Sequence, residues 1–295
     1  MPSLERLKRQ IESTHDLQSV VKTMKALAAV NIRQFEKAVK ALKGYNETVE
    51  AGLQAVLRDR PGFSITARGT AGGRLGAVVF GSDQGMCGAL NETIVAHALS
   101  ALEEQNGGNP PQLVAVGVRA LNRLEEEGRQ VARLFSVPGS VGAVSGLVRK
   151  LLLTIEQWLE ASAIQGVLLF HCTPKSKAAY APRQVRLLPV DRQWLSQIRQ
   201  RAWPGKQLPW FSMAWDPLFA ALIRQYLFVS LYRAAAESLA AENASRLAAM
   251  QGAESNIAER LDELQAQYHR QRQMGITEEL LDIVSGFEAL QEDRE

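Results

Sequence analysis

The stretch MQGAESNIAERLDELQAQY, residues Met250–Tyr268, decides the fold of this chain. Its apolar side chains recur in steps of seven, or of three and four, and polar residues fill the other positions, as the seam of a coiled coil requires. The same spacing continues upstream, so the predicted seam consists of Leu218, Leu222, Val229, Ala236, Leu239, Leu247, Met250, Ile257, Leu261, Leu264 and Tyr268. No proline interrupts Leu218–Glu295, and a single helix over that segment would be about 110 Å long.

A second proline-free segment, Ser3–Arg60, lies at the other end of the chain and would form a helix of about 80 Å. Its seam is predicted at Leu4, Leu7, Ile11, Val21, Met24, Ala28, Ile32, Phe35, Val39 and Leu42, and polar residues interrupt it at Thr14, Gln18 and Lys25. Ser3 is the expected N-cap of this helix, and Asp216, followed by Pro217, is the expected N-cap of the C-terminal one. The sequence therefore predicts a long antiparallel coiled coil of residues 1–60 and 215–290, a rod rather than a compact domain.

Between residues 74 and 208 the hydrophobic period changes. Short continuous apolar runs indicate strands buried on both faces, at Gly76–Phe80, Leu113–Gly117, Gly166–Phe170 and Val185–Val190. Helical patterns alternate with them, at Asn91–Leu102, Ala120–Glu127 and Val144–Ala161. This alternation predicts a Rossmann-like α/β domain with a mostly parallel sheet, inserted between the two helices of the coiled coil. Loops are expected at Gly107–Pro111 and Thr173–Lys177.

The glycine-rich turn after the first strand, Gly81–Asn91, is the one place where a phosphate could be cradled. It has neither GxxxxGK[ST] nor GxGxxG, and no lysine follows at the phosphate position, so we expect a tight turn and no nucleotide site. Cys87 lacks an evident base, because the nearest histidine in sequence, His97, has no acid to orient it. Asp83 and Asp191 are interpreted, like Asp216, as turn or cap residues.

Composition excludes several classes of function. The formal net charge is only +3 and no long basic run occurs, which argues against a nucleic-acid partner. Two cysteines without a CxxC motif fit a reducing compartment. The first residues have no apolar signal core, and no stretch of 18 apolar residues exists, so a protein without a membrane span is expected. The four histidines are scattered, and we expect no metal, no cofactor and no catalytic group.

The C-terminal helix should extend about 20 residues beyond the end of its shorter partner. That extension is not polar: it carries Ile276, Leu280, Leu281, Ile283, Val284, Phe287 and Leu290. Apolar surface of this extent marks an interaction site. We therefore expect the tip to lie in a socket supplied by another protein, with Ile276, Leu280, Ile283, Val284 and Phe287 as the contacting residues.

Four stretches resemble the gamma subunit of F-type ATP synthases. Val21–Ala29 resembles the N-helix signature of that family. Ser82–Asn91 is similar to its SDRGLCGGLN, Glu242–Met250 to its EQASRMVAM, and Ile276–Gly286 to its ITxELxEIVxG. The resemblance spans essentially the whole chain in the right order.

The resemblance implies the central-stalk rotor subunit of a rotary ATP synthase. The coiled coil would stand inside the ring of alpha and beta subunits of the catalytic head. The α/β body would touch the epsilon subunit and the membrane ring of c subunits, at the cytoplasmic face of a bacterial plasma membrane. Such a subunit couples ion flow to ATP synthesis or hydrolysis without catalytic residues of its own.

Site residues carry over by motif position. Met24 and Lys25 would face a lever loop of the beta subunit that is acidic in the family. Arg246 would lie within reach of the stator, and Arg272, Gln273 and Thr277 would meet a beta-subunit catch region near the tip. Two alternatives stay open: Met24 as a core side chain of the coiled coil, and Arg246 and Arg272 as residues of a solvated helix face.

Some positions depart from the family pattern. Asn31 stands where the family usually has lysine, and Phe287 replaces a small residue. These departures suggest the alternate sodium-type bacterial branch. Two other classes of function compete with the rotor: a non-rotary coiled-coil scaffold with an α/β domain, disfavoured by the four ordered motifs, and a nucleotide-dependent enzyme, disfavoured by the missing phosphate and base residues.

Overall fold

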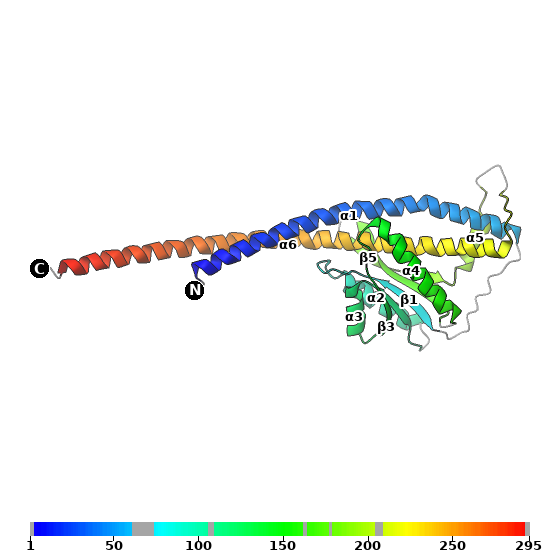
Figure 1. Ribbon diagram of the computed structural model, residues 1–295, viewed down its shortest axis with the longest axis horizontal. Helices are drawn as coiled ribbons and strands as arrows, with labels where there is room; N and C mark the ends of the chain where they lie inside the picture. The colour runs from blue at the N-terminus through cyan, green and yellow to red at the C-terminus, as the bar shows by residue number, and fades with distance from the viewer. Residues whose placement is uncertain are drawn as a thin grey trace. The chain divides into compact units, whose positions relative to one another are not determined.

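A computed structural model describes residues 3–60, 74–105, 109–161, 164–176, 179–203 and 209–292, with side chains of the last helix as far as Ser285 (Figure 1). The chain divides into two compact units. The first contains Met1–Leu27 and Ala248–Glu295, and the second contains Ala28–Leu247. Two long helices pass through both units: α1 (Leu4–Asp59) at the blue end and α6 (Trp215–Glu292), which runs from yellow to red.

The starts of the two long helices test the cap predictions. The backbone N–H of Arg6 donates to the Ser3 hydroxyl at 3.4 Å, which confirms Ser3 as the N-cap of α1. The expectation that Asp216 caps α6 is wrong, because the helix already begins at Trp215. The indole of Trp215 is buried and donates to the Val56 carbonyl at 2.8 Å, which holds the chain in place one residue earlier. Asp216 still lies in the first turn, where a carboxylate favours the helix dipole.

In the first unit, the beginning of α1 packs against the later part of α6. Val21 and three residues of the predicted α6 seam, Met250, Ile257 and Leu261, form a buried cluster. Leu7 and Leu264 are buried as well, with 1% and 2% of their surface exposed. The seven-residue spacing of the sequence therefore identified the packed face of this helix pair.

The second unit contains a five-stranded sheet in the order β3-β2-β1-β4-β5. The first four strands of this order are parallel, and β5 runs antiparallel to β4. The strands are β1 (Leu75–Phe80), β2 (Gln112–Val116), β3 (Val131–Phe135), β4 (Gly166–Ser176) and β5 (Ala179–Leu188). The shorter helices are α2 (Leu90–Gln105), α3 (Val118–Glu126), α4 (Val141–Glu160) and α5 (Arg192–Gln200).

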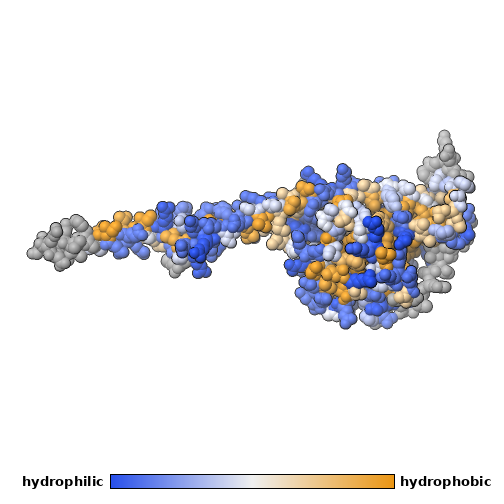
Figure 2. Space-filling model, viewed as in Figure 1, coloured by the Kyte–Doolittle hydropathy of each residue, from blue (hydrophilic) through white to orange (hydrophobic). Residues whose placement is uncertain are grey.

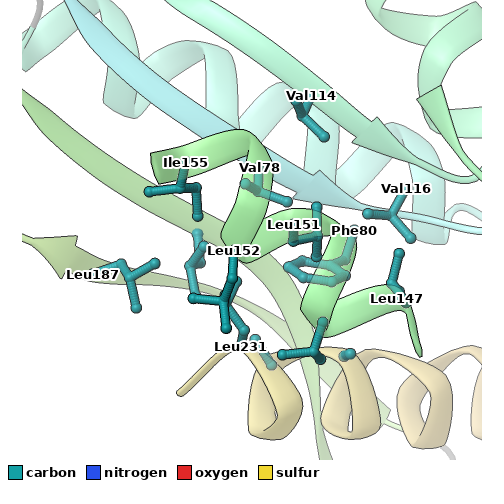
Figure 3. Packing of buried hydrophobic residues seen from close by; sticks show 14 of the residues in the cluster. Val78, Phe80, Val114, Val116, Leu147, Leu151, Leu152, Ile155, Leu187 and Leu231 are labelled. Atoms are coloured by element: carbon teal, nitrogen blue, oxygen red, sulfur yellow. The ribbon is translucent and has the colours of Figure 1, made fainter. Parts of the chain in front are cut away.

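Two apolar layers cover the two faces of this sheet. Since successive side chains of a strand point to opposite faces, Val78 and Phe80 contribute to one layer, and Ala77 and Val79 to the other. The first layer packs the sheet against α4 and α6; Figure 3 shows its labelled residues Val78, Phe80, Val114, Val116, Leu147, Leu151, Leu152, Ile155, Leu187 and Leu231. The second layer packs the sheet against α2 and α3. Both faces are therefore buried, as the continuous apolar runs predicted.

In the second unit α1 and α6 lie side by side and antiparallel. Asn31 donates to Asn243 at 3.3 Å, and Tyr45 donates to Gln225 at 2.8 Å. Later residues of α1 thus meet earlier residues of α6, as antiparallel helices must. A third apolar cluster joins the helices to α5 and includes Val49, Leu53, Leu57, Val190, Leu195, Ile198 and Val229.

Three features of the sheet domain differ from expectation. Strand β3 was not predicted, because only its two ends are partly buried and its middle is exposed. Helix α5 was not predicted either; it is short, and the Asp191 carboxylate caps it by accepting from the Gln193 N–H at 2.8 Å. The loop expected from Thr173 is wrong, since β4 continues to Ser176 and pairs with β5 there. Pro174 is tolerated because the pairing of β4 with β1 ends at Phe170.

Candidate functional site

The last described part of α6 forms an exposed apolar surface. Beyond Leu264, no residue of α6 whose side chain is described is fully buried. The exposed fraction reaches 69% at Ile283 and is close to half or more at Ile276, Leu280, Leu281 and Val284. Figure 2 shows apolar surface (orange) on this part of α6. The predicted tip residues are thus exposed in the isolated chain, except Phe287, whose side chain lies outside the described residues.

The predicted catch-region residues lie on the same stretch of helix. Arg272, Gln273 and Thr277 are all exposed. The Thr277 hydroxyl donates to the backbone carbonyl of Gln273 at 2.9 Å, as threonine side chains do within helices. Their exposure leaves them available to a partner, and their assignment as contacts stays a prediction.

Met24 and Lys25 lie on the packed side of α1. Met24 is half-buried and packs against the cluster of Val21 and Met250. The Lys25 ammonium forms an ion pair with the Glu254 carboxylate of α6, and both side chains are only partly exposed. Sequence reasoning missed this pairing, so any attraction of Lys25 to an acidic partner loop competes with a carboxylate of its own chain.

A second exposed apolar stripe runs along α1 in the same unit. Leu17, Val20 and Leu27 have exposed fractions of 48%, 52% and 59%. They are spaced by three and seven residues, so they share one face of the helix. This face was not predicted from the sequence, because its residues are spaced by three and seven, as the residues of the packed seam are.

Arg246 points into the second unit and is 8% exposed, so the alternative of a solvated helix face does not describe it. Its guanidinium pairs with the Glu242 carboxylate at 2.7 Å, one helical turn away. Burial raises the pKa of the Glu242 carboxyl, and the nearby Arg246 opposes that rise. The two residues, four apart in sequence, are a recognisable helical ion pair, but nothing in the sequence tells on which face they lie.

Side chains of the turn between β1 and α2, and of the first turn of α2, accept hydrogen bonds from the Ser82 N–H and from backbone N–H groups of two neighbouring segments. The Ser82 N–H donates to the Asn91 side chain at 3.0 Å. The two Asp83 carboxylate oxygens accept from the backbone N–H groups of Val118, at 3.0 Å, and Val137, at 2.8 Å. The first backbone N–H of α3 is therefore paired with a carboxylate of another segment. Asp83 is a turn residue, one of the two roles expected for it, and the N-cap position of α3 is Gly117.

The cysteines of this unit lie in its core. Cys87 and Cys172 are both free and buried. Burial raises the pKa of the Cys87 thiol, and it raises the pKa of Cys172 to about 12. A thiol with a raised pKa is a poor nucleophile near neutral pH.

The described part of the chain contains neither a membrane span nor a metal cluster. Within it, no helix is long and apolar enough to cross a membrane. Among the same residues, no group of three or more His, Cys, Asp or Glu side chains is arranged to hold a metal ion.

Comparison with known proteins identifies the family. The family model described as ATP synthase matches residues 3–290. The chain belongs to the ATP synthase gamma family. Among the relatives, the ATP synthase gamma chain of Rhizobium rhizogenes is 29% identical, and the match covers 98% of this chain and all of that protein. The gamma chain of Nitratiruptor sp. is 26% identical over the same shares of the two chains.

Solved structures of this family share the fold. A chain from the mitochondrial ATP synthase of Euglena gracilis, determined with OSCP, F1 and the c-ring in rotational state 3, gives a TM-score of 0.62 at 16% identity. The match covers 99% of this chain and 96% of that one. A chain from the central stalk and c-ring of the Tetrahymena thermophila enzyme gives a TM-score of 0.55 at 18% identity. The family match over nearly the whole chain favours the rotor over the scaffold alternative.

Proposed function

We propose that this chain is the central-stalk rotor subunit of a rotary F-type ATP synthase, a non-catalytic subunit that couples ion flow through the membrane ring to ATP synthesis or hydrolysis in the head. The observation that carries the proposal is the family match over residues 3–290. The geometry supports it, because the 78-residue helix α6 carries, near its C-terminal end, an apolar surface that the described residues of the chain leave exposed.

The proposed partner of the first unit is the ring of alpha and beta subunits. Ile283 and its apolar neighbours on α6, together with Leu17, Val20 and Leu27 on α1, face solvent in the isolated chain. Apolar surface on two helices of one unit is best explained by a partner that surrounds both. The stator contacts proposed at Arg272, Gln273 and Thr277 lie on the exposed stretch of α6. The contacts proposed at Met24 and Lys25 lie on the packed side of α1 and would use the part of each side chain that stays exposed. Arg246 is buried, so a stator contact there would need the partner to reach into the second unit.

The sheet domain is proposed to contact the epsilon subunit and the ring of c subunits. The chain would then be a peripheral component at the cytoplasmic face of a bacterial membrane. The Euglena gracilis and Tetrahymena thermophila structures were determined together with a c-ring, which supports the same arrangement here.

The proposed mechanism follows from symmetry. One rotor cannot contact three equivalent beta subunits in the same way, so each orientation favours a different conformation at each of the three sites. The orientation of the rotor and the nucleotide state of the ring are then linked thermodynamically, and the linkage is reciprocal. Torque can therefore run in either direction, from ions to ATP or from ATP to ions.

Co-purification tests the proposal. A tagged version of this chain, expressed in its own host, should bring down alpha and beta chains in stoichiometric amounts and with ATPase activity. Calorimetry on the isolated chain should detect no stoichiometric micromolar ATP binding, because the turn between β1 and α2 offers no phosphate lysine. A chain that purifies without alpha and beta subunits, or that hydrolyses ATP alone, contradicts the proposed function.

A further inference from the structure

One stretch of α6 buries polar side chains instead of apolar ones. Glu242, Asn243, Ser245 and Arg246 are each less than 10% exposed. Burying such groups is unfavourable unless hydrogen bonds replace those lost to water. The pair of Glu242 and Arg246, at 2.7 Å, accounts for part of this requirement within the helix. Asn243 donates to the Leu239 carbonyl of the same helix at 2.8 Å. The Ser245 hydroxyl and the Arg246 guanidinium donate to a different element.

That element is the turn between β1 and α2. The Ser245 hydroxyl donates to the Cys87 carbonyl at 2.5 Å. The Arg246 guanidinium donates to the carbonyls of Gln84 and Gly85, each at 3.4 Å. Two consecutive residues of α6 thus engage three backbone carbonyls of one short turn.

The turn is itself fixed to the sheet. The Asn91 side chain accepts from the Ser82 N–H at 3.0 Å and donates to its hydroxyl at 2.9 Å. A Cβ at Gly81 would lie 2.5 Å from the Asn91 side-chain oxygen, so only glycine allows this approach. Gly117, in the loop after β2, has a φ of +105°, and a Cβ added to it would lie 2.7 Å from the Ser82 backbone. The Gly81 N–H also donates to the Val116 carbonyl at the end of β2 at 2.8 Å, so the turn is hydrogen-bonded to the sheet.

The contact between α6 and the turn lies at the edge of the sheet where the strands end. The turn follows the carboxyl end of β1, and the strand order reverses between β1 and β4. Open α/β sheets usually bind small ligands at this place. In this chain the Ser245–Arg246 step of α6 is bonded to the turn there, so the position serves attachment of a helix.

We infer that Ser245 and Arg246 are positioning residues that clamp α6 to the turn between β1 and α2, so that the sheet domain and the helix turn as one body when torque is applied. This inference rests on the proposed function, because only a rotor needs to transmit torque from its body to its helix. Directed hydrogen bonds to fixed carbonyls oppose rotation of the helix about its own axis, in addition to the apolar packing of α6 against the sheet.

Hydrogen exchange of the full chain tests the clamp itself. Ser245→Ala removes the bond to Cys87. Ser238→Ala is a matched control, because the buried Ser238 hydroxyl has no hydrogen-bond partner among the residues that the structure describes. Loss of one hydrogen bond should raise the population of the locally opened state about fivefold. Exchange in Ser82–Asn91 should therefore accelerate about fivefold in Ser245→Ala and stay unchanged in Ser238→Ala. If Ser245→Ala does not fold, Ser245→Cys keeps the shape with a weaker donor and should give a smaller acceleration. Equal exchange in the Ser245 and Ser238 variants overturns the clamp.

The assembled complex, reconstituted in vesicles, tests torque transmission. The ratio of ATP-driven ion pumping to ATP hydrolysis should fall in Ser245→Ala when the complex pumps against an ion gradient, because torque favours the opened state of the weakened contact. The ratio should match the wild type in Ser238→Ala. A ratio that is unchanged while exchange accelerates overturns the role in torque. Failure of the wild-type chain to assemble with alpha and beta subunits contradicts the proposed function instead, and the exchange result still stands on its own.

Discussion

Helix α6 behaves in opposite ways in the two units. In the second unit it buries charged and polar side chains, Glu242 and Arg246 among them. In the first unit it exposes apolar ones, with Ile283 69% exposed. Both arrangements reverse the usual distribution of residues between core and surface. The difference shows where each stretch finds its partners. The buried polar residues find them in their own chain, within α6, on α1 and in the turn between β1 and α2. The apolar residues find none in the part of the chain that the structure describes.

The comparison predicts that the two stretches respond differently to substitution. Changes at Glu242–Arg246 should appear in the isolated chain. Changes at Ile276–Val284 should appear only after assembly, because the described part of the chain packs nothing over these side chains.

The largest effect is expected from charges at the tip. Replacing Ile283 and Val284 together by Asp should weaken assembly with the alpha and beta chains roughly tenfold or more, since two carboxylates would enter a site that cannot solvate them. The free chain should change by no more than about 0.5 kcal/mol in its free energy of unfolding, as exposed substitutions do. Urea unfolding of the free chain and titration of assembly by ATPase activity measure the two effects.

The matched control keeps the tip apolar. Ile283→Leu combined with Val284→Ile should assemble like the wild type. If the Asp double variant unfolds in isolation while the assembled head is unaffected, the tip packs onto its own chain and the socket interpretation is wrong.

A smaller effect is expected from the buried carboxyl of Glu242. Burial raises its pKa in the folded chain above the ordinary value of 4.5. At a pH between the pKa of the unfolded chain and the higher pKa of the folded chain, Glu242 holds a proton in the folded chain that it has released in the unfolded chain. The free energy of unfolding therefore falls as the pH rises through that window. Glu242→Gln removes this dependence. Relative to the wild type, the variant should gain stability as the pH is raised from about 4.5, by about 1.4 kcal/mol for each unit by which the two pKa values differ.

Urea unfolding of both proteins across the acidic range measures this difference. The exposed Glu278, changed to Gln, is the control for the loss of one carboxylate at a solvent-facing position. A flat difference for Glu242→Gln would mean that the carboxyl is ionised at no cost in the folded chain.

The smallest effect is expected at Lys25. Lys25→Glu places two carboxylates side by side at Glu254, which should cost about 1 kcal/mol or less because both side chains are partly exposed. In the reconstituted complex, ion pumping should fall relative to ATP hydrolysis if Lys25 also faces an acidic partner loop. The double exchange Lys25→Glu with Glu254→Lys separates the two roles. It should restore the stability of the free chain and leave pumping low; restored pumping would show that Lys25 acts only within its own chain.

Much of the fold could be predicted because its pattern is local. Proline-free segments with apolar steps of three and four identified both long helices, and continuous apolar runs identified β1, β2 and β4. Strand β3 carried no such signal, since its middle residues face solvent. The start of α6 was placed two residues late, at Pro217 instead of Trp215, because the buried bond of Trp215 is a tertiary contact and has no local signature.

The candidate site was predictable only in part, for the same reason. The apolar tip residues Leu280, Ile283 and Val284 are exposed because α6 is longer than α1. The lengths of both helices could be estimated from the sequence, so this exposure was predicted. The pairing of Lys25 with Glu254 and the burial of Arg246 depend on which faces of distant helices meet. Residues far apart in sequence show no periodicity relative to one another, so these contacts required the structure.

Thiol labelling of an Ile283→Cys variant tests most directly whether the tip is enclosed by a partner. Background labelling should be low, because Cys87 and Cys172 are buried and their thiol pKa values are raised. The introduced thiol should react rapidly in the free chain, where Ile283 is 69% exposed. In the assembled complex the account predicts protection of at least about tenfold, in line with local opening of a packed interface. Equal labelling rates in the free chain and the assembled complex would contradict it.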